Sequence, residues 1–192
     1  MAEVKGNRFI HRLDYLRAHD PGGAEERILA DMDPEFVRQL RKGLIKNQWY
    51  PIGEYAKFHR LLDRHLGQGD GVLVRELGRL SARDAFKGIY RVFFKVGSPE
   101  FIIHSAPILW RQLYNSGTMR IEAEPEAGRS RHRMVISGFD EPYEELWQIM
   151  EGWIEGTLAL AGVKHVKVWR SPQPRYPGSN AEILASWDAV TN

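Results

Sequence analysis

Histidine and carboxylate side chains are the groups through which this sequence could do acid–base or metal chemistry. The chain has seven histidines: His11, His19, His59, His65, His104, His132 and His165. None stands in a His-Glu-x-x-His or other metal-ligand spacing. His59 and Asp63 lie one helical turn apart, which favours a surface pair over a catalytic dyad. We therefore predict no catalytic residue and no metal site, and a non-enzymatic protein.

His104 is the one histidine whose surroundings suggest a cofactor, because it lies in the most apolar predicted helix. Haem nitric-oxide-binding domains need such a histidine and also carry a Tyr-x-Ser-x-Arg motif for the haem propionates. Tyr114 and Ser116 match the first two positions of that motif, but Thr118 stands where Arg is needed. Arg120 comes two residues late. We predict a hydrogen-bonded core or rim histidine and no cofactor, and keep haem-based gas sensing as a third hypothesis.

The aromatic residues of the second half are the candidates for a ligand pocket. Aromatic side chains at helical spacing usually fill a core, and the alternative is a cavity for an apolar ligand. The candidate pocket residues, with His104 among them, are Phe93, Phe101, His104, Trp110, Tyr114, Trp147 and Trp153. Gly152 and Gly156 would let another backbone approach their helix closely, either from the sheet or from a second subunit.

Local signals place these residues on helices that precede and separate short strands. Asp33-Pro34 and Ser98-Pro99 are typical helix starts, with a capping side chain followed by proline. Pro107 predicts a kink or restart near Ser105.

Strand alternation begins after Gly117. Residues 119–123 and 132–136 alternate as a hairpin, and a long helix and two further strands over 163–170 and 181–187 follow. Helices therefore outnumber the strands and mostly precede them. This order favours an α+β domain, with an antiparallel sheet covered mainly on one face by helices.

Composition restricts the cellular setting. The net charge is only +2, the chain has no cysteine, and no run approaches the length of a membrane span. Arg129, Arg131 and Arg133 alternate along one strand, which is typical of a solvated face or of protection against edge pairing. We predict a soluble cytoplasmic protein that does not bind nucleic acid.

Several motifs in order resemble a bacterial family of unknown function that is expanded in myxobacteria. They are Gly78–Asp84, Tyr90–Phe94, Gly97–Glu100, Leu109–Arg111, Tyr114–Gly117, Gly152–Gly156, Gly162–Val168 and Ser186-Trp187. That family is similar, more remotely, to 4-vinyl-reductase-like domains, which share a fold with the Bet-type subunits of the TRAPP vesicle-tethering complex. The resemblance implies a four-stranded antiparallel sheet backed by helices, frequent dimers and an interior pocket for an apolar ligand. Related sequences often carry a cysteine pattern before the last strand, which residues 174–181 lack, so a thiolate zinc site is excluded.

These observations lead to one main hypothesis and one alternative besides haem sensing. We expect a single domain over residues 1–192, with a 4-vinyl-reductase-like core over 48–192 and helices over 1–47 as candidates for a dimer contact. The main hypothesis is a sensory or regulatory module in which an apolar small molecule occupies the helix–sheet interior and biases the surface of a homodimer towards a protein partner. The alternative is an interaction scaffold or adaptor with a solid core and no ligand.

Overall fold

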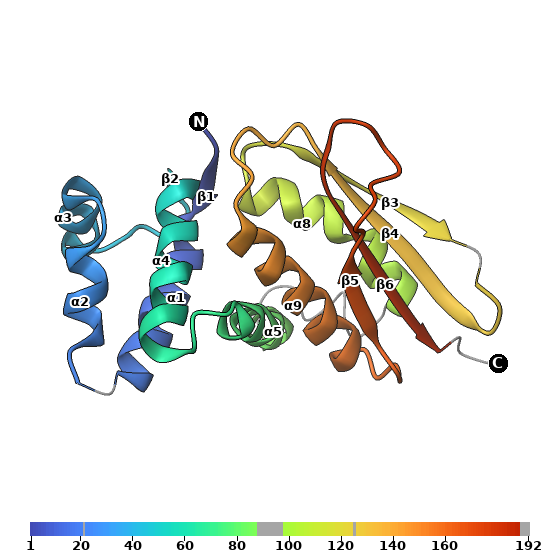
Figure 1. Cartoon of the computed structure of the whole chain (residues 1–192), viewed down its shortest axis with the longest axis horizontal. Helices are drawn as coiled ribbons and strands as arrows, with labels where there is room; N and C mark the ends of the chain where they lie inside the picture. Colours follow the sequence, from blue (N-terminus) through green and yellow to red (C-terminus); the bar gives the residue numbers. More distant parts are fainter. Residues whose placement is uncertain (21, 88–97, 125, 189–192) are drawn as a thin grey trace.

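The computed structural model describes residues 1–20, 22–87, 98–124 and 126–188, and Figure 1 shows the arrangement of their elements. The helices are α1 (Gly6–His19), α2 (Ala24–Ala30), α3 (Pro34–Lys42), α4 (Ile52–Leu66), α5 (Val72–Lys87), α7 (Pro99–His104), α8 (Ala106–Leu113) and α9 (Glu144–Leu160). The strands are β1 (Glu3–Lys5), β2 (Trp49–Pro51), β3 (Thr118–Glu124), β4 (Arg129–Ser137), β5 (Lys167–Arg170) and β6 (Ser179–Asp188).

The main sheet confirms the predicted α+β class. It is four-stranded and antiparallel, in the order β3-β4-β6-β5. The predicted hairpin is present as β3 and β4, with Ile121 opposite Met134. Helices α8 and α9 lie on one face of this sheet (Figure 1). Alternate residues on that face, such as Met134 and Ile183, are fully buried because they pack against the helices.

The predicted helix starts are confirmed. The Asp33 side chain accepts a hydrogen bond from the Phe36 backbone N–H at 2.9 Å, and Ser98 caps α7 in the same way through Phe101. The predicted restart near Ser105 is also present, since α7 ends at His104 and α8 begins at Ala106. Pro107 is tolerated there because the first turn of a helix needs no backbone donor.

Glycines bring α5 and α9 into direct backbone contact. A Cβ added to Gly152 would lie 1.8 Å from the carbonyl oxygen of Arg75, and one added to Gly78 would lie 2.2 Å from that of Ile149. The prediction of a close approach at Gly152 is thus correct. The partner, however, is α5, and not the sheet or a second subunit that the sequence suggested.

The N-terminal helices stand at one end of the molecule, and the main sheet stands at the other (Figure 1). The two-stranded ladder β1–β2 joins the chain start to the segment before α4. The start is also tied to the end of α8, because the Glu3 backbone N–H donates to the Asn115 side chain at 2.7 Å and the Asn115 backbone N–H donates to the Glu3 carbonyl at 3.2 Å. Hydrogen bonds therefore join the two ends of the molecule at this point.

The second face of the sheet carries a network of ion pairs. The Arg133 guanidinium donates to Glu124 at 2.5 Å and to Glu182 at 2.6 Å, and Arg131 pairs with Glu124 at 3.1 Å. Arg133 is only 6% exposed. The prediction of a solvated or edge-protecting arginine row is wrong for this residue, because β4 lies inside the sheet between β3 and β6.

Among the described helices, none combines the length and the apolar character that crossing a membrane would require.

Candidate functional site

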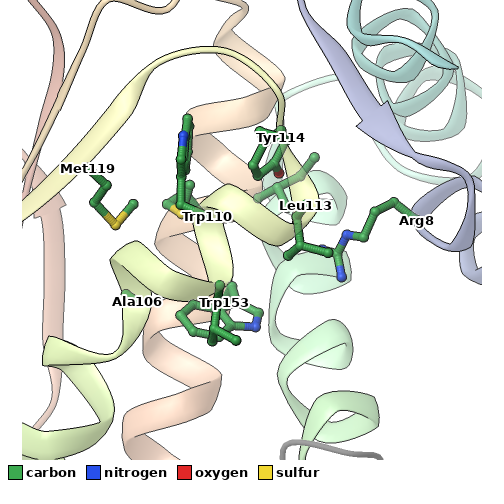
Figure 2. A pocket seen from close by; sticks show the side chains of 10 residues that line it. Arg8, Ala106, Trp110, Leu113, Tyr114, Met119 and Trp153 are labelled. Atoms are coloured by element: carbon green, nitrogen blue, oxygen red, sulfur yellow. The ribbon is translucent and has the colours of Figure 1, made fainter. Parts of the chain in front are cut away.

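An apolar cavity of about 40 Å³ lies where the N-terminal helices meet the sheet half of the molecule. Its lining comes from α1, α8, β3 and α9, as Figure 2 shows for the labelled side chains. The lining residues are Arg8, Ala106, Leu109, Trp110, Leu113, Tyr114, Met119, Ile149, Met150 and Trp153. The cavity therefore borders segments that are distant in sequence.

Two polar side chains of the lining, Trp110 and Tyr114, are neutral groups. The Trp110 indole N–H donates to the carbonyl oxygens of Ser116 and Gly117, at 3.1 and 3.2 Å. The Tyr114 ring lies 4.5 Å from the Trp110 ring, centroid to centroid. Burial raises the pKa of Tyr114 to about 12, so its phenol is neutral at physiological pH. The site suits an apolar guest, and its residues offer no base or nucleophile for catalysis.

Arg8 is the exception to this apolar lining. It extends from α1 toward Leu113 on α8 (Figure 2). Tyr114 also connects the two halves, because it forms an antiparallel bridge with Val4 on β1. The cavity therefore borders the contact between the N-terminal end and α8.

The structure brings together three of the seven predicted pocket residues, namely Trp110, Tyr114 and Trp153. Trp147 lies elsewhere in the core, with its ring 5.9 Å from that of Phe139. Phe101 is 50% exposed. Phe93 lies outside the described residues.

His104, the seventh predicted residue, is exposed and does not line the cavity. Its ring makes a T-shaped contact with the His132 ring, with 5.2 Å between the ring centroids. The His132 ring in turn stacks on that of Trp187 at the same centroid distance. Burial, followed by the neighbouring His104, lowers the pKa of His132. His104 thus belongs to an aromatic stack against the sheet.

The cavity residues do not fit a haem group. All seven histidines of the chain lie within the described residues, and none of them lines the cavity. A volume of about 40 Å³ has room for a few waters at most, whereas pockets for drug-sized ligands span roughly 300–1,000 Å³. Thr118, where the propionate motif needs Arg, is exposed at the start of β3. No axial histidine and no matching propionate motif are therefore in place at this cavity.

A metal centre is likewise not formed within the described ranges, where no group of three or more histidine, aspartate and glutamate side chains could hold a metal ion.

A buried polar cluster surrounds Arg12, and the sequence pattern did not predict it. Arg12 is 2% exposed, and its Nε donates to His59 Nε2 at 2.7 Å while its Nη2 donates to Ser81 Oγ at 2.7 Å. The predicted pairing of His59 with Asp63 is wrong, because Asp63 accepts from the Gly71 backbone N–H instead. The only available signal was an arginine inside the apolar stripe of Phe9, Leu13 and Leu16.

Comparison with solved structures places the fold among haem-nitric oxide/oxygen binding (H-NOX) proteins. An unliganded Fe(II) H-NOX protein mutant from K. algicida has a TM-score of 0.72 with 12% identity, over 97% of this chain and 98% of that one. An H-NOX protein from S. oneidensis in the Fe(II)NO state has a TM-score of 0.68 with 13% identity, over 97% and 100%. No family model matches the sequence. No curated protein matches it either.

These neighbours correct the resemblance inferred from sequence. The expected relation to the myxobacterial family and to 4-vinyl-reductase-like or TRAPP domains is wrong, because solved structures that match this chain over 96% or more of its length are H-NOX proteins. Among the motif residues that suggested that relation, Gly78 and Gly152 serve helix packing. Packing glycines of this kind occur in many helical folds and do not identify one.

Proposed function

We propose that the protein is a non-enzymatic sensory module that binds a small apolar ligand in the cavity between α1, α8 and α9. The observation that carries this proposal is an apolar cavity walled by both ends of the molecule. Its neutral phenol and satisfied indole suit binding and offer no catalytic group. The whole-chain likeness to H-NOX structures supports a ligand-sensing fold.

A bound ligand would act through the contacts between the two ends. It would add van der Waals contacts between α1 and α8, next to the backbone bonds that join Glu3 to Asn115. A ligand shifts a conformational equilibrium only as far as it binds one arrangement better than the other. The readout would therefore be a change in how the N-terminal helices rest on α8.

Haem-based gas sensing is the second candidate. It is favoured by the solved neighbours, which include an H-NOX protein in the Fe(II)NO ligation state and structures studied for haem distortion. The absence of histidine from the cavity lining and the position of His104 argue against it. Haem-based sensing would require the protein to form a saturable one-to-one complex with haemin.

Xenon is a direct probe of the cavity, because dry apolar cavities bind it. We expect dissolved xenon to shift the methyl NMR signals of Leu113, Met119 and Met150, which line the cavity. Ala106→Leu fills the cavity from α8 and should remove these shifts. Ala18→Leu, at an exposed position of α1, is the matched control and should keep them.

Two results would contradict the proposal. One is the absence of any saturable xenon shift at the cavity methyls of the wild-type protein. The other is a shift that persists unchanged in Ala106→Leu. The first would favour the adaptor hypothesis, in which the core is solid.

A further inference from the structure

A second site is suggested by a polar groove between α1 and α5, which has a volume of about 420 Å³. This falls within the size range of small-ligand pockets. Exposed His11, His19 and Arg83 lie along it, together with Asp14 and Asp84. Asp84 is already engaged, since it pairs with His11 at 3.3 Å. The groove is separate from the apolar cavity, and the two share no lining residue.

Arg12 contributes to the wall of this groove although it is almost fully buried. It donates to two neutral groups, the His59 ring and the Ser81 hydroxyl. His59 accepts as a neutral imidazole, because its Nδ1 faces the Tyr55 carbonyl oxygen at 2.7 Å. These two hydrogen bonds use the Nε and the Nη2 of the guanidinium.

Asp14 and Asp84 line the same groove, but among the described residues no carboxylate is one of the groups that shift the pKa of Arg12. Burial lowers the pKa of Arg12, and the groups that act on it besides are the phenols of Tyr55 and Tyr114 and the cation of Arg8. Buried charges in folded proteins are normally paired, because an unpaired one loses its hydration without compensation. Arg12 is therefore a buried cation whose hydrogen-bond acceptors are neutral, on the wall of a groove large enough for a small ligand.

We propose that the groove between α1 and α5 binds a small oxyanion, a carboxylate or a phosphate group, with Arg12 as its anchor. A guanidinium presents donors in a planar fork that suits either oxyanion. Arg83 at the open side of the groove adds a second cation. The site is independent of the cavity ligand, so either proposal can fail without the other.

Thermal unfolding in sodium phosphate, sodium acetate and sodium chloride at matched ionic strength tests this site. A ligand that binds only the folded protein raises the melting temperature in a saturable way. We expect this for phosphate or acetate in the wild type, and the two arms identify the preferred oxyanion. Arg12→Gln should weaken the binding at least tenfold, Arg83→Gln about twofold to threefold, and the remote Arg38→Gln not at all.

Ser81→Asp provides a second test through charge compensation. Its carboxylate would take the place of the hydroxyl that Arg12 contacts at 2.7 Å, and so supply the anion from within the chain. We expect this variant to lose the response to phosphate and acetate, while Ser81→Ala keeps it.

A third test uses hydrogen exchange of the wild-type protein, so it does not depend on whether a variant folds. Phosphate or acetate should slow the exchange of backbone amides in α1 and α5. The proposal is overturned if both oxyanions act like chloride on the wild type, or if Arg12→Gln or Ser81→Asp retains the full response.

Discussion

Two buried arginines, Arg12 on α1 and Arg133 on β4, solve the same physical problem in different ways. Arg133 donates to two carboxylates, Glu124 and Glu182, and these more than offset the burial that would lower its pKa. Arg12 has only neutral acceptors, and its pKa is lowered. Arg133 thus has carboxylate partners within the chain, whereas the hydrogen bonds of Arg12 go to neutral groups. This difference separates a structural ion pair from a candidate binding residue.

The largest loss of stability is expected when Arg133 is replaced. Arg133→Met leaves Glu182, which is 1% exposed, buried without its cation. Breaking a buried pair by removing one partner costs about 3–5 kcal/mol in the free energy of unfolding, and urea unfolding measures it. Arg38→Met is the control, because Arg38 and its partner Glu35 are both exposed, and it should change stability by less than about 0.5 kcal/mol. A loss as small as the control's would mean that Arg133 is not held by its carboxylates.

The free energy of unfolding should depend on pH differently in the two halves, and this effect should be smaller than that of Arg133→Met. Burial, followed by the charge of Arg12, holds the pKa of His59 well below 6.5. The unfolded chain therefore takes up a proton that the folded chain resists, and the free energy of unfolding falls as pH drops below 6.5. The slope is up to about 1.4 kcal/mol per pH unit.

The sheet should lose stability only at lower pH. Burial would raise the pKa of Glu124 and of Glu182. The hydrogen bond and charge of Arg133 outweigh it for Glu124, and backbone N–H hydrogen bonds followed by that of Arg133 outweigh it for Glu182, so that both pKa values lie below 4.5. Their contribution is present above that pH and is lost as pH falls through the folded-state values.

Urea unfolding and hydrogen exchange at a series of pH values check both windows. α1 and α4 should lose protection before β4 and β6 do. His59→Gln should remove the upper window, whereas His165→Gln, at an exposed site, should keep it. Stability that stays flat between pH 7 and 5 in the wild type would contradict this account.

Local signals predicted much of the fold from sequence. The caps at Asp33 and Ser98, the restart at Pro107 and the alternation of the β3–β4 hairpin are encoded within a few residues, so they could be read directly. Non-local pairing could not be read in this way. The three-residue strands β1 and β2 pair across 40 or more residues, and β6 enters the sheet between β4 and β5.

The candidate site was only partly predictable for the same reason. Trp110, Tyr114 and Trp153 were expected in a pocket from their aromatic character, and they line the cavity. The contribution of Arg8 from α1 depends on how two distant segments meet. The Arg12–His59–Ser81 cluster likewise joins three helices, and no spacing within one helix reveals it.

Titration of the purified protein with haemin, followed by absorption spectroscopy, tests the central claim most directly. The central claim is that an H-NOX-like fold here holds a small-ligand cavity that lacks the residues for haem. We predict no saturable one-to-one complex, and a Soret band that remains that of free haemin. A shifted Soret band that saturates at one equivalent and is lost in His104→Ala, but not in the control His165→Ala, would contradict it.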